Sequence, residues 1–567
     1  ASPPPCKLQA FTPLNCRKND PAAALFLPFA TRDPAGAAGT SEFRIYPAHA
    51  APWTAPMSST PDAMPPGIDA CPAPASHHAF AASPRFLGHP TPLFTLFFAE
   101  MWERFSYYGM RALLTLYMVG PLAVGGLSYP TAKAALIYGT YTMSVYMLSI
   151  PGGTVADNLL GQRAAVLLGG IIIAAGHFSM AVNSETTFYL GLVLIVLGTG
   201  LLKPNISAMV GQLYASDDPR RDAGFSIFYM GINVGAFFAP LVTGFLAQHS
   251  LFKEQLTRWG FDPAHSWHWG FAAAGVGMVL GLIVFVTFGG GLKHVGQAPV
   301  RVPGAWKRPA LMLVGTLGLW AVVLLSDRTG FTWLRYLFIL VPTALMVWFG
   351  YSANPETRRL GAIFFFFIGA LIFWALFEQA GTSLNLFADR FTATHIAGLE
   401  VPSSWYQSAN PIFVMLLAPL FALLWTRLGR RQPSSPLKFT LGLFFLATSF
   451  ALMIPAAKLA AHGRVSPLWL LGLYFLSTVG EMCLSPVGLS TFTKLSPRHL
   501  VGAMMGIWFL GAAFGNKFAG VLAASFGEGE EGRLDHFFAQ QSLAVFAIAA
   551  AFLALSPWVR RRMGQVQ

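Results

Sequence analysis

Long apolar stretches recur along the chain from about residue 92 onward, separated by short polar or basic segments. Each stretch is about 18–28 residues long, enough for a helix to cross the ~30 Å hydrocarbon layer of a membrane. We predict fourteen spanning helices over residues 92–119, 130–157, 164–181, 186–210, 223–248, 267–290, 309–326, 333–351, 360–387, 405–426, 437–458, 467–492, 500–525 and 540–560. A transmembrane β-barrel is excluded, because the chain lacks the alternating segments of about ten residues that barrel strands require.

The composition agrees with an all-α membrane protein that crosses the bilayer many times. Of the 567 residues, 54% are hydrophobic and 11% are charged. In a typical soluble domain about a quarter of all residues are charged. The mean hydropathy of +0.54 points the same way.

Basic residues between the predicted spans indicate the orientation. An even number of spans puts both termini on one side, and the loops and C-terminal tail of that side carry 18 Lys and Arg against 9 opposite. The positive-inside rule therefore predicts cytoplasmic termini in a plasma membrane. This asymmetry and attraction to anionic lipid account for the net charge of +13, so we expect no nucleic-acid partner.

The first 88 residues have a different composition, rich in Ala, Pro and Ser and without periodicity. We interpret residues 1–88 as a disordered cytoplasmic extension, and a later start at Met57 or Met64 is an open alternative. Cys6, Cys16 and Cys71 lie in this segment on the reducing side of the membrane, which predicts no disulfide framework.

The first predicted span contains four ionisable residues, Glu100, Glu103, Arg104 and Arg111. At 3.6 residues per turn they share one helix face, roughly 140° wide, with two tyrosines. A charge at the bilayer centre costs at least ~2.5–3.5 kcal/mol on insertion scales. This face must therefore look toward other helices or a water-filled path, which makes it the first candidate for a functional site.

Further ionisable residues lie inside later spans, each close to Pro or Gly: Lys203, Glu378 and Glu481. Pairing that only holds helices together is the alternative to a functional role. Acids and bases occur in both halves of the chain, and this distribution favours function. Three other polar residues are interpreted as structural, because two lie near helix ends and one is isolated: Asp157, Lys517 and His177.

Several motifs resemble those of one transporter family. Residues 100–109 match the signature E-x-x-E-R-F-x-Y-Y-G of the proton-dependent oligopeptide transporter family, part of the major facilitator superfamily. Similar agreement is found at 203–205, 228–235, 374–379, 407–411 and 481–488. The resemblance implies two six-helix bundles, residues 89–290 and 353–567, around a site that opens alternately to either side. It also implies a cytoplasmic linker at 291–308 and an inserted helical hairpin at 309–352, as in bacterial members.

A di- or tripeptide is a zwitterion, so a site that accepts many sequences should hold both of its termini. Cationic and hydroxyl groups of the first bundle suit the carboxylate: Arg104, Arg111, Lys203, Tyr108, Tyr146 and Tyr229. Acidic and amide groups suit the ammonium: Glu481, Asn410 and Asn233. The resemblance supports these assignments and adds Trp374, Ser485 and Trp508 to the expected substrate-binding set.

Proton coupling is expected to involve buried carboxylates and their cationic partners. Burial favours the protonated form of Glu378 unless Arg111 or another cation pairs with it. Glu100 and Glu103 are expected to alternate between a proton and Lys203, next to Arg104. The resulting hypothesis is a monomeric symporter in a bacterial inner membrane that imports di- and tripeptides with protons. It predicts no cofactor apart from the coupling proton, and no metal.

Other functions remain open. Related transporters on the same fold move nitrate, drugs or amino-acid derivatives, and a transporter-like receptor is a less favoured alternative. An anion carrier would not need the acidic and amide set of Glu481, Asn410 and Asn233. An enzyme is not expected, because no metal-ligand spacing, nucleophile elbow or phosphate-binding loop is found.

Overall fold

The computed structural model describes residues 85–215, 218–300, 302–328, 330–396, 398–496, 501–526 and 533–564, and most of these residues are helical. Most of the predicted extension, with its three cysteines and both alternative start methionines, lies outside these residues. Residues 85–88 differ from the expected disorder. There β1 (Arg85–Phe86) pairs antiparallel with β2 (His89–Pro90), directly before the first long helix.

The first bundle consists of six long helices. These are α1 (Pro92–Val119), α2 (Thr131–Val155), α3 (Gln162–Met180), α4 (Glu185–Gln212), α5 (Arg221–Gln248) and α7 (Ser266–Thr287). Helix α1 packs against α5 and α7, so its charged residues lie inside the protein as its amphipathic pattern predicts. The short helix α6 (Ser250–Arg258) follows α5.

The second bundle repeats this organisation with helices from the second half of the chain. Its members are α10 (Pro355–Phe377), α11 (Ser383–Phe391), α12 (Ala409–Leu428), α13 (Ser435–Ala460), α14 (Leu468–Leu495), α15 (Val501–Ala523) and α16 (Leu534–Met563). A short strand pair, β3 (His395–Ile396) and β4 (Leu399–Glu400), connects α11 to the 3₁₀ turn η8 (Ser403–Ser408). Helix α13 packs between α14 and α16, while α15 contacts α2 of the first bundle.

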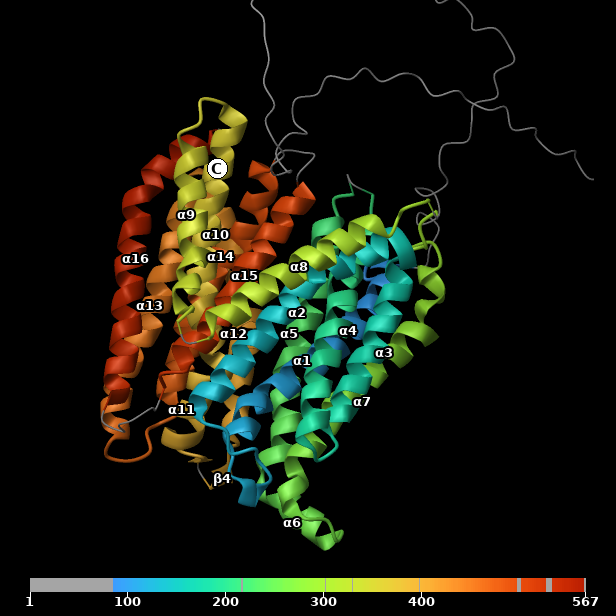
Figure 1. Ribbon diagram of the computed structural model, residues 1–567, viewed down its shortest axis with the longest axis vertical. Helices are drawn as coiled ribbons and strands as arrows, with labels where there is room; N and C mark the ends of the chain where they lie inside the picture. The colour runs from blue at the N-terminus through green and yellow to red at the C-terminus, as the bar shows by residue number, and fades with distance from the viewer. Residues whose placement is uncertain are drawn as a thin grey trace, which may run out of the picture. The chain divides into compact units, whose positions relative to one another are not determined.

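Two helices between the bundles form a hairpin, α8 (Lys307–Ser326) and α9 (Leu337–Gly350). Figure 1 shows α8 running obliquely between the blue-to-green and the orange-to-red helices, with α9 beside α10. Among the described residues, twelve helical segments are long and apolar enough to cross a membrane. Helices α1 and α2, of 28 and 25 residues, are long enough as well. The fourteen predicted spans therefore each have a helical counterpart.

One predicted span is broken. Helix α10 ends at Phe377, the 3₁₀ turn η7 (Glu378–Gly381) follows, and α11 continues the span. A helix break frees backbone carbonyls, which must find other donors inside a membrane. The carbonyl of Gly381 accepts a hydrogen bond of 2.7 Å from Thr115 of α1. The break thus connects the two bundles and places the buried side chain of Glu378 at the start of the turn, beside the space between the bundles.

The two bundles touch closely on the side of α6 and β4, which we call the α6 side. Ser408 donates to the carbonyl of Phe237 at 2.7 Å, and Gln248 donates to Ser403 at 2.8 Å. Glu400 accepts from the backbone and the hydroxyl of Ser250. Partial burial alone would raise the pKa of Glu400, but the two bonds from Ser250 and the nearby His249 and His395 together lower this pKa. The carboxylate therefore stays charged in its contact between the bundles.

On the opposite side, which we call the linker side, the segment between α7 and α8 binds the first bundle. Gly296 accepts from the backbone of Arg163 and donates to the side chain of Gln212. These contacts fix the segment to the start of α3 and the end of α4. The π-helical turn η3 (Ala156–Leu160) ends α2 at the same side.

Helices α2 and α15 cross through two glycines near the α6 side. A Cβ atom added at Gly520 would overlap the carbonyl oxygen of Ala135 and lie 2.8 Å from the Cα of Gly139. Backbone atoms cannot move aside cheaply, so this crossing requires a residue without a side chain.

We expect Gly520→Ala to lower the thermal stability of the purified protein, because its methyl group pushes α2 and α15 apart. Gly318→Ala on α8 is the matched control, since nothing lies within 4 Å of a Cβ atom there. Removing a helical glycine alone should stabilise by roughly 0.5–1 kcal/mol. Melting temperatures that rise in both variants would contradict the close crossing.

Candidate functional site

A cavity of about 1370 Å³ lies between the two bundles. Its lining reaches Asp157, Ser207 and Leu489 near the linker side, whereas contacts between the bundles close the α6 side. Eleven of the twelve expected substrate-binding residues line it: Tyr108, Arg111, Tyr146, Lys203, Tyr229, Asn233, Trp374, Asn410, Glu481, Ser485 and Trp508. The exception is Arg104.

Arg111 and Glu378 form an ion pair across the two bundles. The guanidinium Nη2 of Arg111 lies 2.5 Å from a carboxylate oxygen of Glu378, and both side chains are almost fully buried. The pair borders the cavity at its closed end. Opposite charges favour each other strongly where water is excluded, so either residue left alone would be costly.

Arg104 binds both glutamates of its own helix instead of lining the cavity. Its Nε lies 3.2 Å from Glu100, one turn away, and it also contacts Glu103. All three side chains are buried. The expectation that Arg104 faces the substrate carboxylate differs from this arrangement, because two neighbouring carboxylates already hold its guanidinium.

Lys203 enters the cavity from α4, where Pro204 interrupts the hydrogen-bond pattern of the helix. Its ammonium lies 3.9 Å from the centre of the Tyr146 ring, a cation–π contact. It also interacts electrostatically with Glu100 and Glu103. Lys203 thus lies at the wall of the cavity and within electrostatic range of the charged cluster of α1.

Glu481 supplies the acidic group of the second bundle. Asn410 on α12 donates to its carboxylate at 3.1 Å and to Thr478 at 2.9 Å. No cation forms an ion pair with Glu481 among the described residues. A carboxylate that borders a cavity and is fixed by an amide is well suited to an ammonium ligand.

The remaining expected residues shape the walls. Asn233 donates to the carbonyl of Tyr229 one turn earlier, which fixes its amide on α5. Trp508 packs against Phe492, with ring centres 5.0 Å apart. Such aromatic walls provide apolar area for side chains of varied shape.

Three tyrosines near the ion pair were not predicted as site residues: Tyr138, Tyr141 and Tyr474. Tyr138 lies with its ring 5.8 Å from the guanidinium of Arg111, and Tyr474 lines the cavity. The hydroxyls of Tyr138 and Tyr141 are buried with no hydrogen-bond partner among the described residues. Tyr138 lies two turns before Tyr146 on one helix, and this spacing was the available signal.

The residues interpreted as structural differ in their partners. Asp157 accepts a bond from Gln162 at 3.3 Å, and His177 is fully buried with both ring nitrogens unpartnered in the described part of the chain. Cys483 is a buried free thiol. Lys517 binds Asp327, in the loop between α8 and α9, at 2.5 Å.

Two other features of the described residues bear on the choice of candidate site. No three His, Cys, Asp or Glu side chains gather there as a metal site would require. A second hollow of about 660 Å³, between α1, α5, α6 and α7, is lined by apolar side chains such as Trp102 and Phe238. It carries no ionisable group, so the central cavity is the candidate site.

Comparison with known proteins points to one family. The sequence profile of the POT family matches residues 163–535. A protein named peptide transporter YePEPT, from Yersinia enterocolitica, is 39% identical over 510 residues, which cover 85% of this chain and 97% of that protein. A di-/tripeptide transporter of Lactococcus lactis is 35% identical over 507 residues, covering 85% and 98% of the two chains.

Comparison with solved structures points to the same family. The crystal structure of a peptide transporter POT in complex with sulfate superposes with a TM-score of 0.75 at 38% identity, covering 88% of this chain and all of that one. A POT family transporter in complex with 5-aminolevulinic acid gives a TM-score of 0.73 at 31% identity, over 85% and 99% of the chains. The resemblance seen in the motifs is therefore confirmed: the chain is a multi-pass membrane protein that belongs to the POT family of transporters.

Proposed function

We propose that the protein is a proton-coupled symporter that imports di- and tripeptides by alternating access. The observation that carries this proposal is the distribution of charge around the cavity. Arg111 and Lys203 lie on the first bundle, whereas Glu481 with its amide partner Asn410 lies on the second. A zwitterionic peptide that spans the cavity would contact both bundles and draw them together.

The relatives named as peptide transporters support this substrate class. The POT neighbour that holds 5-aminolevulinic acid supports a second candidate, transport of other small molecules with an amine and a carboxylate. Both candidates use the same two charged walls. Nitrate and other simple anions fit less well, because Glu481 would repel them.

Proton coupling is proposed to act through Glu378. While it is ionised, Glu378 holds Arg111 and keeps the α6 side closed. Protonation removes its charge, so Arg111 becomes available to the substrate carboxylate and the bundles can separate. Glu100, Glu103, Arg104 and Lys203 form a second proton-sensitive cluster in this proposal, in which Lys203 exchanges between the acids and the substrate.

With both termini in the cytoplasm, the linker side faces the cytoplasm and the described cavity is open inward. A proton that enters across 100 mV supplies about 2.3 kcal/mol, which favours uptake. We propose that one chain, acting as a monomer, is the transport unit, because its two bundles enclose the cavity and supply both of its charged walls.

Purified protein in lipid vesicles should accumulate a labelled dipeptide when the outside is acidic and the interior negative. The proton gradient drives this uptake, so a proton ionophore should abolish the accumulation. A panel of unlabelled dipeptides, nitrate, free amino acids and 5-aminolevulinic acid should compete according to substrate class. Uptake that ignores the pH gradient would refute symport, and competition by nitrate alone would refute the substrate class.

Glu378→Gln should lose uptake driven by a proton gradient but keep the exchange of labelled for unlabelled peptide. The amide cannot bind and release a proton, whereas the cavity retains its substrate contacts. Counterflow and gradient-driven uptake are measured on the same vesicles. Glu254→Gln on α6 is a matched control, since that side chain is largely exposed and should leave both activities unchanged. Equal loss of both activities would show that Glu378 binds substrate or maintains the fold.

Glu481→Gln should weaken the binding of ordinary dipeptides, because it removes the charge that faces the ammonium group. A hydrogen bond to a charged group contributes about 1.5–3 kcal/mol, so the dissociation constant should rise roughly 10- to 100-fold. Binding of an analogue that lacks the amine should change little. A calorimetric or fluorescence titration of both ligands tests this, and equal weakening would exclude the proposed contact.

A further inference from the structure

The inserted hairpin contributes directly to the wall of the central cavity. Five residues of α8 line it: Leu311, Met312, Gly315, Thr316 and Leu319. They recur at helical spacing and form one stripe along the helix. Their neighbours Val314 and Leu317 do not line the cavity, and the helical spacing puts them on the opposite face of α8, as expected for side chains that face lipid.

The position of α8 follows from the way α2 and α15 diverge. Near the α6 side the two helices touch at Gly139 and Gly520. Toward the linker side, both helices line the cavity, α2 from Tyr146 to Thr154 and α15 from Ala512 to Met505. Helix α8 packs against α2 along this stretch, and Trp320 donates to Ser144 at 3.1 Å. The stripe on α8 therefore lies where the two bundles separate.

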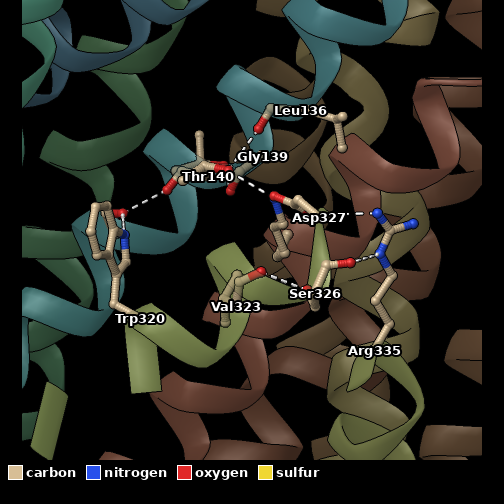
Figure 2. Close-up of polar contacts among 11 residues, drawn as sticks. Leu136, Gly139, Thr140, Trp320, Val323, Ser326, Asp327 and Arg335 are labelled. Carbon is tan, nitrogen blue, oxygen red and sulfur yellow. Dashed lines mark hydrogen bonds and ion pairs between the residues drawn. The ribbon is translucent and has the colours of Figure 1, made fainter. Parts of the chain in front are cut away.

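A charged cluster fixes the tip of the hairpin at this crossing. Asp327 lies 2.5 Å from the ammonium of Lys517 on α15, and that ammonium donates to Thr140 on α2 at 2.8 Å. Figure 2 shows Asp327 between Thr140 on one side and Arg335 of the 3₁₀ turn η6 (Thr332–Tyr336) on the other. Arg335 lies 3.4 Å from Asp327. One hairpin carboxylate thus holds a helix of the second bundle, and through it a helix of the first.

The strength of this anchor follows from burial. The side chain of Lys517 is only 5% exposed, and Asp327 is its only carboxylate partner among the described residues. Asp327 has a second partner in Arg335. Losing Asp327 would leave a buried, unpaired ammonium, whereas losing Arg335 would leave the bridge to α2 and α15 intact.

We propose that α8 is a side wall of the substrate cavity, contacting the side chains of transported peptides through Gly315 and Thr316, and that Asp327 anchors it through Lys517. The substrate contact rests on the proposed function, whereas the position of the wall does not. The wall is apolar apart from the Thr316 hydroxyl, so it suits varied peptide side chains more than the charged peptide termini.

Cysteine accessibility tests the wall. In a variant with Cys6, Cys16, Cys71 and Cys483 replaced, single cysteines are placed at Gly315, Thr316 and, as a matched lipid-facing control, Val314. The protein is reconstituted in vesicles and treated with a charged methanethiosulfonate, which reacts with thiols in water. Gly315→Cys and Thr316→Cys should react several-fold faster than Val314→Cys, and a saturating dipeptide should slow them. Equal rates at all three positions would overturn the wall.

The labelling experiment with a saturating dipeptide tests this inference separately from the proposed function. If the cysteines at positions 315 and 316 react fast and a bound dipeptide does not slow them, the substrate contact is overturned but the position of α8 at the cavity wall is supported. Binding of the dipeptide is measured by an independent titration. Fast reaction with no dipeptide binding at all refutes the proposed function and still supports the wall.

The same rates test the anchor. Asp327→Asn should reduce the difference between positions 315 and 314, because α8 loses its fixed orientation. Arg335→Gln is the control and should preserve that difference. The double variant Asp327→Asn/Lys517→Gln removes the anchor without leaving an unpaired charge, in case the single variant does not fold. An unchanged difference in the double variant would overturn the anchoring role.

Discussion

The buried ion pair between Arg111 and Glu378 joins the two bundles at the closed end of the cavity and constrains how they can separate. Removing an ion from water costs several kcal/mol even after the protein relaxes, and only a well-placed partner repays it. Arg111 comes from α1 and Glu378 from the break after α10, so each bundle supplies half of the pair. Separation of the bundles on this side requires that something else satisfy both charges. A proton can satisfy Glu378 and a carboxylate can satisfy Arg111, and this explains physically why one site could couple both ligands.

The acidic cluster of α1 is also buried, but it contains more carboxylates than cations. Arg104 can neutralise only one of the two carboxylates that it contacts, so the cluster of Glu100, Glu103 and Arg104 would keep one negative charge with both glutamates ionised. In a buried site this charge must be balanced by a proton or by a nearby cation. Lys203 interacts with the cluster electrostatically while its ammonium rests on the Tyr146 ring. Since the ring holds a cation without neutralising it, the exchange of Lys203 to a substrate carboxylate that we propose would break no ion pair.

The sequence predicted those features that depend on local periodicity. Apolar runs gave the fourteen spans, and the helical repeat put Glu100, Glu103 and Arg111 on an inward face. The contact partner of each charged side chain was harder to predict from the sequence, because it depends on how helices that are distant in the chain cross. Arg104 pairs with its own helix and does not face the cavity, and Tyr138 lies beside Arg111 without an obvious motif. The partner of Lys517 lies 190 positions away in the hairpin, where spacing carries no information.

The hairpin, like the ion pair, contacts both bundles. Helix α8 packs on α2 of the first bundle, whereas α9 packs on α10 of the second. Its tip contacts both bundles through Asp327, Lys517 and Thr140. If the bundles rock about the central site, the two arms of the hairpin follow different partners and the angle between them must change. The crossing of α2 and α15 lies at the tip, so a pivot there allows the arms to move while the buried charges stay paired. The hairpin can therefore remain a wall of the cavity during rocking, provided that the motion is centred on this crossing.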